Sequence, residues 1–335
     1  MNGVRWARFA LWAFCSVYLV SPLDSWALET DAGLSNWLLR VHEASKNRSY
    51  TGTFVVSAGG NLASAKIWHV CDGEQQVERV EPLSGVPRAT YRRNDHVVTL
   101  YPQSKVAVVE TRDSLGMFPA LLKSNDASIG DFYQFKALGS ERLAGFEADA
   151  IALIPKDAWR YAYRVWTEKR SGLVLQLQTL NEAGRVIEQS AFSELQLDAP
   201  VRMVQLVKQM ENTAGYLVNR PAIRPVTAEA SGWNLKIPVS GFRSTGCFSR
   251  TLAGSPSDAK SQLNVIQWIF TDGLATLSVF VESFDARRHQ REGAVDLGGA
   301  THIVTHKLGD WWATAVGEVP SKTLAAFVEA LERRQ

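Results

Sequence analysis

Short segments in which apolar and polar residues alternate fill most of residues 50–197, with turn-forming residues between them. The segment YTGTFVVSA, residues 50–58, alternates in this way and ends at the turn signal Gly-Gly-Asn. A period of two places alternate side chains on one buried face of a strand. Parallel strands need a crossover of about a dozen residues or more, usually a helix, and no such segment separates these strands. The sequence therefore predicts an antiparallel meander, in which residues 76–81 form a weaker, exposed strand.

Two helices are predicted, one near each end of the chain. Residues 31–48 have an apolar stripe at helical spacing, and Pro320 suits the first turn of a second helix that closes the chain. A helix on a curved sheet is the simplest way to bury the apolar face of each. The fold class is therefore α+β, with a large antiparallel sheet partly covered by the first helix and a small antiparallel sheet packed by the second. The stripes consist of Leu34, Trp37, Leu38 and Val41, and of Leu324, Phe327, Val328 and Leu331.

The beginning of the chain has the features of an export signal. Arg5 and Arg8 precede an apolar run, and Ser25 and Ala27 occupy the small-residue positions that a signal peptidase requires. The apolar run is too short to span a bilayer, which takes about 20 residues. We therefore expect residues 1–27 to be a signal peptide that is removed on export.

A change of composition divides the rest of the chain. Residues 198–231 mix prolines, asparagine and small polar residues, as linkers do. We predict a large domain at 28–197, a linker at 198–231 and a small domain at 232–335. The net charge is +2 and falls to +1 without Arg5, Arg8 and Asp24. This charge is too small to indicate a basic surface that binds nucleic acid.

The clearest hairpin lies in the small domain, at residues 265–285. Its strands flank Asp272-Gly273, which predicts a two-residue type I′ turn, and a second hairpin turns at Gly309-Asp310. Aromatic side chains on such strands anchor protein interfaces, although a domain of this size also needs some of them for its core. We predict that part of the first hairpin binds a partner. The candidate residues are Trp268, Phe270, Asp272, Gly273, Thr276, Ser278 and Phe280.

Apolar residues that share one face of their strands predict a ligand cavity in the large domain. Ordinary core packing explains the same pattern, whereas an open, curved sheet would present these residues to acyl chains or an amphipathic peptide. Arg79, Arg88, Arg92 and Arg93 would meet anionic head groups at its rim, or else form a solvated edge. The candidate cavity residues are Phe54, Val56, Trp68, Val98, Leu100, Trp166, Leu173, Leu175 and Leu177.

Sequence signatures of catalysis, cofactor binding or metal binding are not found. The chain has no Gly-x-Ser-x-Gly, phosphate-loop or His-Glu-x-x-His motif. His302 and His306 lie four apart in a predicted strand, where that spacing spans about 13 Å and does not suit a shared metal. Cys71 and Cys247 are far apart in sequence, so a disulfide and two buried thiols both remain open. We therefore expect a protein that is not an enzyme and has no cofactor.

Three stretches resemble the RseB/MucB family of periplasmic sigma-E regulatory proteins. They are YTGTFVV after the first helix, RLAGFEADAIALIPKDAWRYAYRVWTEKRSGLVLQLQTL in the middle, and FTDGLATLSVFVE with GDWWATAVGEVPSKTLAAFVEAL at the end. The resemblance implies a large LolA-like domain, which is a half-open antiparallel barrel with helices in its mouth, and a small curved sheet with a helix. It also implies a periplasmic location.

The resemblance further implies a function. The protein would bind the periplasmic part of a single-pass anti-sigma factor, shield it from the site-1 protease, and be released by lipopolysaccharide or lipoprotein acyl chains. An alternative is a periplasmic lipid or lipoprotein carrier without a regulatory partner. A carrier needs no second domain with an apolar hairpin, so residues 231–335 favour the regulator. A homo-oligomer remains open.

Overall fold

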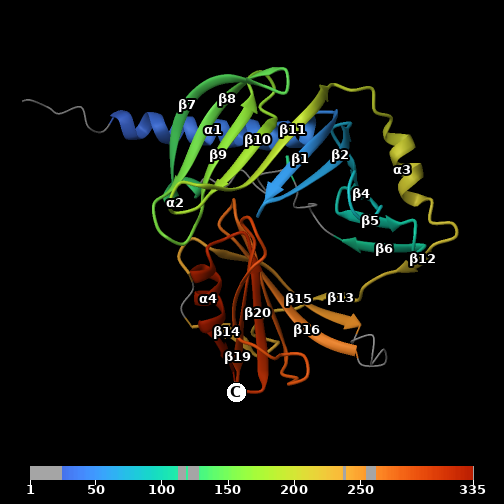
Figure 1. The fold of residues 1–335 in the computed structure, drawn as a ribbon, viewed down its shortest axis with the longest axis vertical. Helices are drawn as coiled ribbons and strands as arrows, with labels where there is room; N and C mark the ends of the chain where they lie inside the picture. The colour runs from blue at the N-terminus through green and yellow to red at the C-terminus, as the bar shows by residue number, and fades with distance from the viewer. Residues whose placement is uncertain (1–24, 112–117, 120–127, 237–238, 254–261, 335) are drawn as a thin grey trace, which may run out of the picture.

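The computed structural model describes residues 25–111, 118–119, 128–236, 239–253 and 262–334. Figure 1 shows a large curved sheet above a smaller sheet, with helix α1 (Ser25–Asn47) running behind the large sheet. The predicted signal peptide lies outside these ranges apart from its last three residues, and α1 begins before residue 31, where the first helix was expected. Within the described residues, no helix is long and apolar enough to span a membrane.

The large sheet has twelve strands in the order β12-β6-β5-β4-β3-β2-β1-β11-β10-β9-β8-β7, and its two edge strands, β12 and β7, do not pair with each other. Neighbouring strands are antiparallel except for the short pair of β12 and β6, so the predicted meander and half-open architecture are confirmed. The strands are β1 (Tyr50–Ala58), β2 (Asn61–Cys71), β3 (Gln76–Pro82), β4 (Ala89–Arg93), β5 (His96–Tyr101), β6 (Val106–Thr111), β7 (Tyr133–Leu143), β8 (Phe146–Pro155), β9 (Ala162–Glu168), β10 (Val174–Leu180), β11 (Val186–Leu197) and β12 (Leu217–Asn219).

The two faces of the large sheet are covered by different helices. The stripe of α1 packs into the main apolar cluster, which also takes in the short helix α2 (Ile129–Phe132). Helix α3 (Met203–Glu211) lies on the opposite face, over β3 and β4, where Leu206 and Met210 are buried. The prediction of an exposed strand at 76–81 is wrong, because Val77 is buried under α3 and Val80 is buried in the main cluster on the opposite face.

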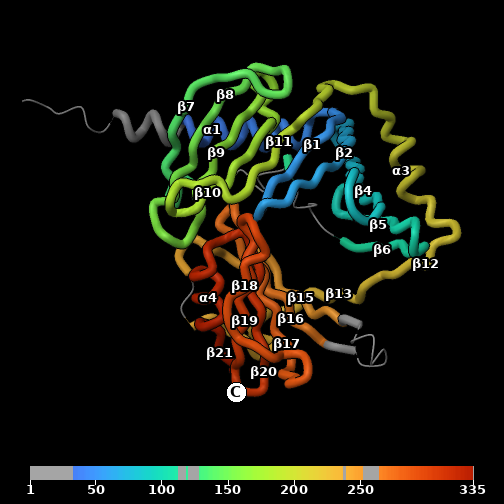
Figure 2. Tube along the Cα trace, in the orientation of Figure 1, coloured from blue at the N-terminus to red at the C-terminus, as the bar shows by residue number. Residues whose placement is uncertain are grey.

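The predicted linker region holds regular structure. It contains α3, then β12 at the edge of the large sheet, then β13 (Ile223–Pro225) at the edge of the small sheet. The chain in Figure 2 runs down one side of the molecule from α3 through β12 to β13. The linker therefore adds a strand to each sheet and ties the two together.

The small sheet has the order β13-β15-β16-β17-β20-β19-β18, and helix α4 (Ser321–Glu329) packs on β17, β19 and β20. Leu324, Phe327, Val328 and Leu331 are all buried, as the apolar stripe predicts. A separate pair of short strands, β14 and β21, lies beside this sheet. The strands are β14 (Trp233–Leu235), β15 (Arg243–Ala253), β16 (Gln262–Thr271), β17 (Thr276–Ser283), β18 (Gly293–Asp296), β19 (His302–Leu308), β20 (Trp311–Gly317) and β21 (Leu331–Arg333).

The two hairpin turns of the small sheet differ. Leu308 pairs with Trp311, so the predicted turn at Gly309-Asp310 is confirmed. In the other hairpin Thr271 pairs with Thr276, which leaves a four-residue turn in place of the expected two-residue type I′ turn. The reason lies in Asp272, whose Oδ1 accepts hydrogen bonds from the N–H groups of Leu274 and Ala275 and so supports a longer turn.

Candidate functional site

The predicted partner-binding residues of β16 and β17 divide between two faces of the small sheet. Trp268 and Phe270 point toward α4, where the Phe270 ring lies 4.7 Å from the ring of Phe327. Thr276, Ser278 and Phe280 alternate with buried residues and lie half-buried on the opposite face. The structure therefore brings only the second group together on a surface that α4 does not cover.

The strand register makes that surface continuous across the sheet. One cross-strand row runs from Phe248 through Gln267 and Phe280 to Thr314, and the next from Ile269 through Ser278 to Val316 and Ile303. We call these eight residues, on the face opposite α4, the open face: Phe248, Gln267, Ile269, Ser278, Phe280, Ile303, Thr314 and Val316.

The open face combines apolar side chains with an unused hydrogen-bond acceptor. Its phenylalanine and aliphatic side chains remain half-buried, so each still exposes apolar surface to solvent. Gln267 donates a hydrogen bond of 3.0 Å from Nε2 to Ser278 Oγ, whereas its Oε1 is buried without a partner among the described residues. A buried acceptor without a partner is costly to the folded chain.

Asp272 and Gly273, the other two predicted partner residues, lie at the junction of the two domains. Asp272 is 0% exposed, and its Oδ2 accepts hydrogen bonds from Tyr133 Oη at 2.8 Å and from Arg160 Nε at 2.9 Å. Burial, followed by the neighbouring Tyr163 and Asp272, raises the pKa of Tyr133 well above its usual value, so this hydroxyl keeps its proton and donates. The turn of the hairpin is thus held by the large domain.

Arg160 is the centre of this junction. Its guanidinium also donates to Ser240 O at 2.7 Å and to the Asp157 carboxylate, and its carbon Cζ lies 4.4 Å from the centroid of the Phe132 ring. The side chain of Arg160 is 0% exposed, so these partners, in place of water, must stabilise its charge. Because its hydrogen bonds point in defined directions, the paired guanidinium fixes the position of the hairpin turn relative to the large domain.

Further contacts extend the junction on both sides of Arg160. Thr323 lies in the first turn of α4, and its Oγ1 donates a hydrogen bond to Trp159 O at 2.8 Å. Tyr161 Oη and His302 Nε2 lie 2.7 Å apart, and Glu188 accepts a hydrogen bond of 3.2 Å from Ala300 N. The two domains therefore meet through directional polar contacts.

Sequence reasoning missed the junction. A signal was present in DAWRYAY, residues 157–163, because a single arginine among aromatic residues is typical of a buried, paired charge. Its partner Asp272 lies 112 residues further along the chain, so the pairing could not be read from spacing.

The nine predicted cavity residues do not share one site. Six of them belong to the cluster under α1, where Leu173 and Leu175 are 1% exposed and the rings of Phe54 and Phe118 lie 5.6 Å apart. Trp68, Val98 and Leu100 belong to the clusters under α3, on the opposite face of the sheet. The six that share the cluster are Phe54, Val56, Trp166, Leu173, Leu175 and Leu177.

The arginines predicted at the cavity rim take other positions. Arg92 is buried and its Nε donates to Glu78 Oε2 at 2.7 Å, and Arg79 donates from Nη2 to Glu81 Oε2 at 2.6 Å. Arg93 lies 3.9 Å from Glu211 of α3, and Arg88 is exposed. Arg79 and Arg93 lie on the face under α3, whereas Arg92 and Glu78 continue the cross-strand row of Tyr50 and His69 on the face under α1.

Groups with catalytic or metal-binding potential remain separate in the described part of the chain. No three His, Cys, Asp or Glu side chains come together there as a metal site. His302 and His306 lie in β19, as expected, and His306 Nδ1 is 2.9 Å from Glu292 Oε2. Cys71 and Cys247 are both free thiols, and burial raises the pKa of each.

The fold and these surfaces define a two-domain protein in which a large half-open sheet contacts a small sheet with an open face. A family model of the MucB/RseB N-terminal domain matches residues 34–210, and one of the MucB/RseB C-terminal domain matches residues 227–332. The chain belongs to the MucB/RseB family.

Relatives of known name cover nearly the whole chain. It is 27% identical to the sigma factor AlgU regulatory protein MucB of Pseudomonas aeruginosa over 87% of this chain and 88% of the relative. It is 23% identical to the sigma-E factor regulatory protein RseB of Haemophilus influenzae over 96% of this chain and 98% of the relative. It is also similar to the crystal structure of MucB in complex with MucA(peri), with 26% identity, a TM-score of 0.67, and coverage of 90% and 99%.

Proposed function

We propose that this protein is a negative regulator of a sigma-E-type envelope stress response. It would act in the periplasm and bind the periplasmic part of a single-pass anti-sigma factor. The names of the relatives, which are sigma factor regulatory proteins, support the regulatory role. A similar MucB has been crystallised with MucA(peri), and this supports a partner of the same kind.

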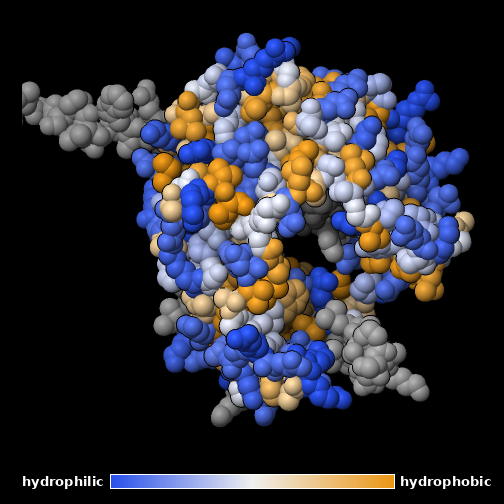
Figure 3. Space-filling model, in the orientation of Figure 1, coloured by the Kyte–Doolittle hydropathy of each residue, from blue (hydrophilic) through white to orange (hydrophobic). Residues whose placement is uncertain are grey.

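The open face is the part of the molecule best suited to such a partner. A periplasmic tail that is disordered when free pays an ordering cost on binding, which apolar anchors and backbone hydrogen bonds must offset. Phe280 and its apolar neighbours provide the anchors. Figure 3 shows a hollow between the two domains on the side where the linker runs, which would give an extended segment room beside the small sheet.

Binding would protect the anti-sigma factor from the site-1 protease. A protease needs an accessible, flexible segment, so a tail held on a folded surface is cleaved only after it dissociates. A lipopolysaccharide or lipoprotein acyl chain that binds only the unoccupied protein would lower the affinity for the tail, and this coupling is reciprocal.

An acyl chain would compete with α1 for the apolar cluster of the large domain. Leu34, Leu38 and Val41 of α1 are 2–3% exposed in that cluster. A chain can enter only if some of these contacts are released, which would make the response depend on how firmly α1 is held.

The test uses the full exported protein, the periplasmic segment of the anti-sigma factor and the site-1 protease. We expect the wild-type protein to slow cleavage, and Phe280→Asp to lower the affinity for the segment by at least about tenfold, because it places a charge among the apolar anchors. Val204→Asp is the matched control, since Val204 is 81% exposed on α3, away from the open face. Cleavage at the same rate with and without the wild-type protein would contradict the proposal. If the protein instead binds acyl chains but not the segment, it is a carrier.

A further inference from the structure

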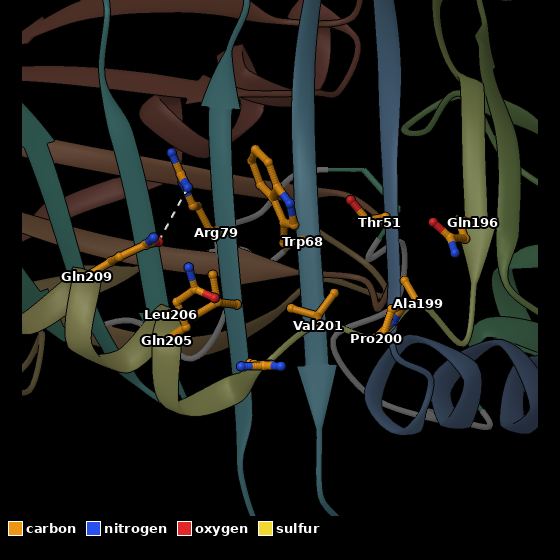
Figure 4. A pocket seen from close by; sticks show the side chains of 11 residues that line it. Thr51, Trp68, Arg79, Gln196, Ala199, Pro200, Val201, Gln205, Leu206 and Gln209 are labelled. Atoms are coloured by element: carbon orange, nitrogen blue, oxygen red, sulfur yellow. Dashed lines mark hydrogen bonds between the residues drawn. The ribbon is translucent and has the colours of Figure 1, made fainter.

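A pocket lies on the outer face of the large sheet, where the chain leaves β11 and enters α3. Its volume is about 360 Å³, and β1, β2, β3, the segment before α3 and α3 itself line it. In Figure 4 the ring of Trp68 stands beside Arg79, while Gln205, Leu206 and Gln209 approach from α3. This face is opposite to the one that α1 covers, so the pocket is separate from the apolar cluster discussed above.

The wall of the pocket is an aromatic ring with cations around it. Trp68 of β2 pairs in register with Arg79 of β3, and the Arg79 guanidinium carbon lies 4.6 Å from the centroid of the Trp68 ring. Lys66 Nζ lies 5.2 Å from the same centroid. Leu206, which is 5% exposed, adds an apolar contact from α3.

Arg79 has hydrogen-bonding capacity to spare. Its Nη2 is paired with Glu81, but its Nη1 has only a long contact of 3.3 Å to Gln209 Oε1. Its Nε is buried without a partner among the described residues. The amide of Gln209 is a neutral acceptor, and a carboxylate would be a stronger one in its place.

Arg202 supplies a second cation at the mouth of the pocket. Its side chain is exposed, and no residue in the described ranges forms a hydrogen bond or ion pair with it. It also precedes the first turn of α3, which contains no acidic residue and has no side-chain cap. None of the residues that line the pocket is acidic, and its two arginines, of which Arg79 is paired with Glu81, favour an anion.

We propose that this pocket binds a small organic anion, namely a carboxylate joined to a flat apolar body. The body would stack on Trp68 against Leu206, and the carboxylate would accept hydrogen bonds from Arg202 and from Arg79 in place of Gln209. The volume is near the lower end of the range for ligand pockets, which suits a small acid and excludes a long acyl chain. The site does not depend on the function proposed above.

Two sources could supply this chemistry, a free aromatic acid or the carboxy-terminal end of a peptide. Titration calorimetry of the full exported protein with 3-phenylpropionate and with N-acetylphenylalanine compares the two. 3-Phenylpropanol has the same body without the charge, and octanoate has the charge on an acyl chain. We expect both aromatic acids to bind, and the one that binds more tightly identifies whether a free acid or a peptide end is the natural ligand. The alcohol should bind at least about tenfold more weakly than 3-phenylpropionate.

Three variants test whether the aromatic acid binds in this pocket. Arg202→Gln removes an exposed charge and should weaken 3-phenylpropionate at least about tenfold without changing the thermal midpoint. Gln205→Trp should fill the pocket and block it, whereas Arg185→Gln, an exposed arginine after β10, should leave affinity unchanged. Equal binding of acid and alcohol, tightest binding of octanoate, no binding of either aromatic acid, or normal affinity in both Arg202→Gln and Gln205→Trp would overturn the proposal.

Discussion

Asp272 shows how one residue can serve two domains. One of its carboxylate oxygens holds the hairpin turn and the other accepts from Tyr133 and Arg160 of the large domain. Both members of the ion pair have side chains that are 0% exposed. Removing one charge from such a pair leaves the other buried and poorly compensated, which costs more than the pair itself contributes.

We therefore expect Asp272→Asn to destabilise the protein by at least about 2 kcal/mol, although the amide keeps the size of the side chain and an acceptor for the turn. Urea unfolding of the exported chain measures this. Asp310→Asn is the matched control, because Asp310 lies exposed in the other hairpin turn of the same sheet. Adding Arg160→Met to Asp272→Asn should recover part of the loss, since it removes a buried charge that then has only the Asp157 carboxylate as a counter-ion. No recovery would mean that the turn, and not the ion pair, carries the effect.

His69 makes a second residue-scale prediction, on pH. It is 0% exposed, its Nδ1–H donates to Arg48 O at 2.7 Å, and its Nε2 has no partner among the described residues. Burial lowers the pKa of His69 below its usual value of 6.5 and outweighs the nearby Glu78 carboxylate. The unfolded chain then binds a proton at a pH where the folded chain does not, so stability falls as the pH drops below about 6.5.

Thermal midpoints measured from pH 7.5 to 5 should therefore decline, and His69→Gln should make the decline shallower. His96→Gln, at an exposed histidine in a hairpin of the same sheet, should leave the slope as it is in the wild type. A slope that both substitutions change equally would show that His69 is not the group responsible.

At the scale of elements, α1 is held by one face only. Leu38 is 2% exposed and Leu39, its neighbour in the helix, is 42% exposed. We expect Leu38→Ala to cost about 2–5 kcal/mol of unfolding free energy, because it leaves a cavity in the main cluster. Leu39→Ala should change stability by less than about 0.5 kcal/mol. Denaturant unfolding monitored by circular dichroism compares the two, and similar losses would contradict the burial of one face.

The elements also show what the sequence could and could not predict. Alternation and turn residues predicted the antiparallel strands and the turn at Gly309-Asp310, because both are local. The helix α3 was missed because proline and charged residues flank it. Its Leu206 and Met210 are recognised as core residues only from their contacts with strands far away in sequence. Trp68 was predicted to line the same cavity as Phe54 because alternation shows which residues share a face of a strand. It does not show which helix covers that face.

For the whole molecule, the junction joins the two domains at several points. The hairpin turn, the start of α4 and the loop before β19 each contact the large domain, while the linker ties the two sheets at their edges. The proposed response to acyl chains requires coupling between the open face and the large domain, and these contacts connect the two among the described residues.

Gly59 tests that coupling at the edge of the junction. A Cβ atom at Gly59 would lie 2.5 Å from Gly298 Cα, whereas one at Gly60 would meet nothing within 4 Å, and both glycines have positive φ angles. Alanine at either position costs about 1–2 kcal/mol of backbone strain, so the difference between the two variants reports the contact between domains. We expect Gly59→Ala, but not Gly60→Ala, to speed hydrogen exchange at the Ala300 amide, which donates to Glu188 across the junction. Calorimetry should then show a broader unfolding transition for Gly59→Ala. If both variants exchange and unfold alike, this contact does not hold the domains together.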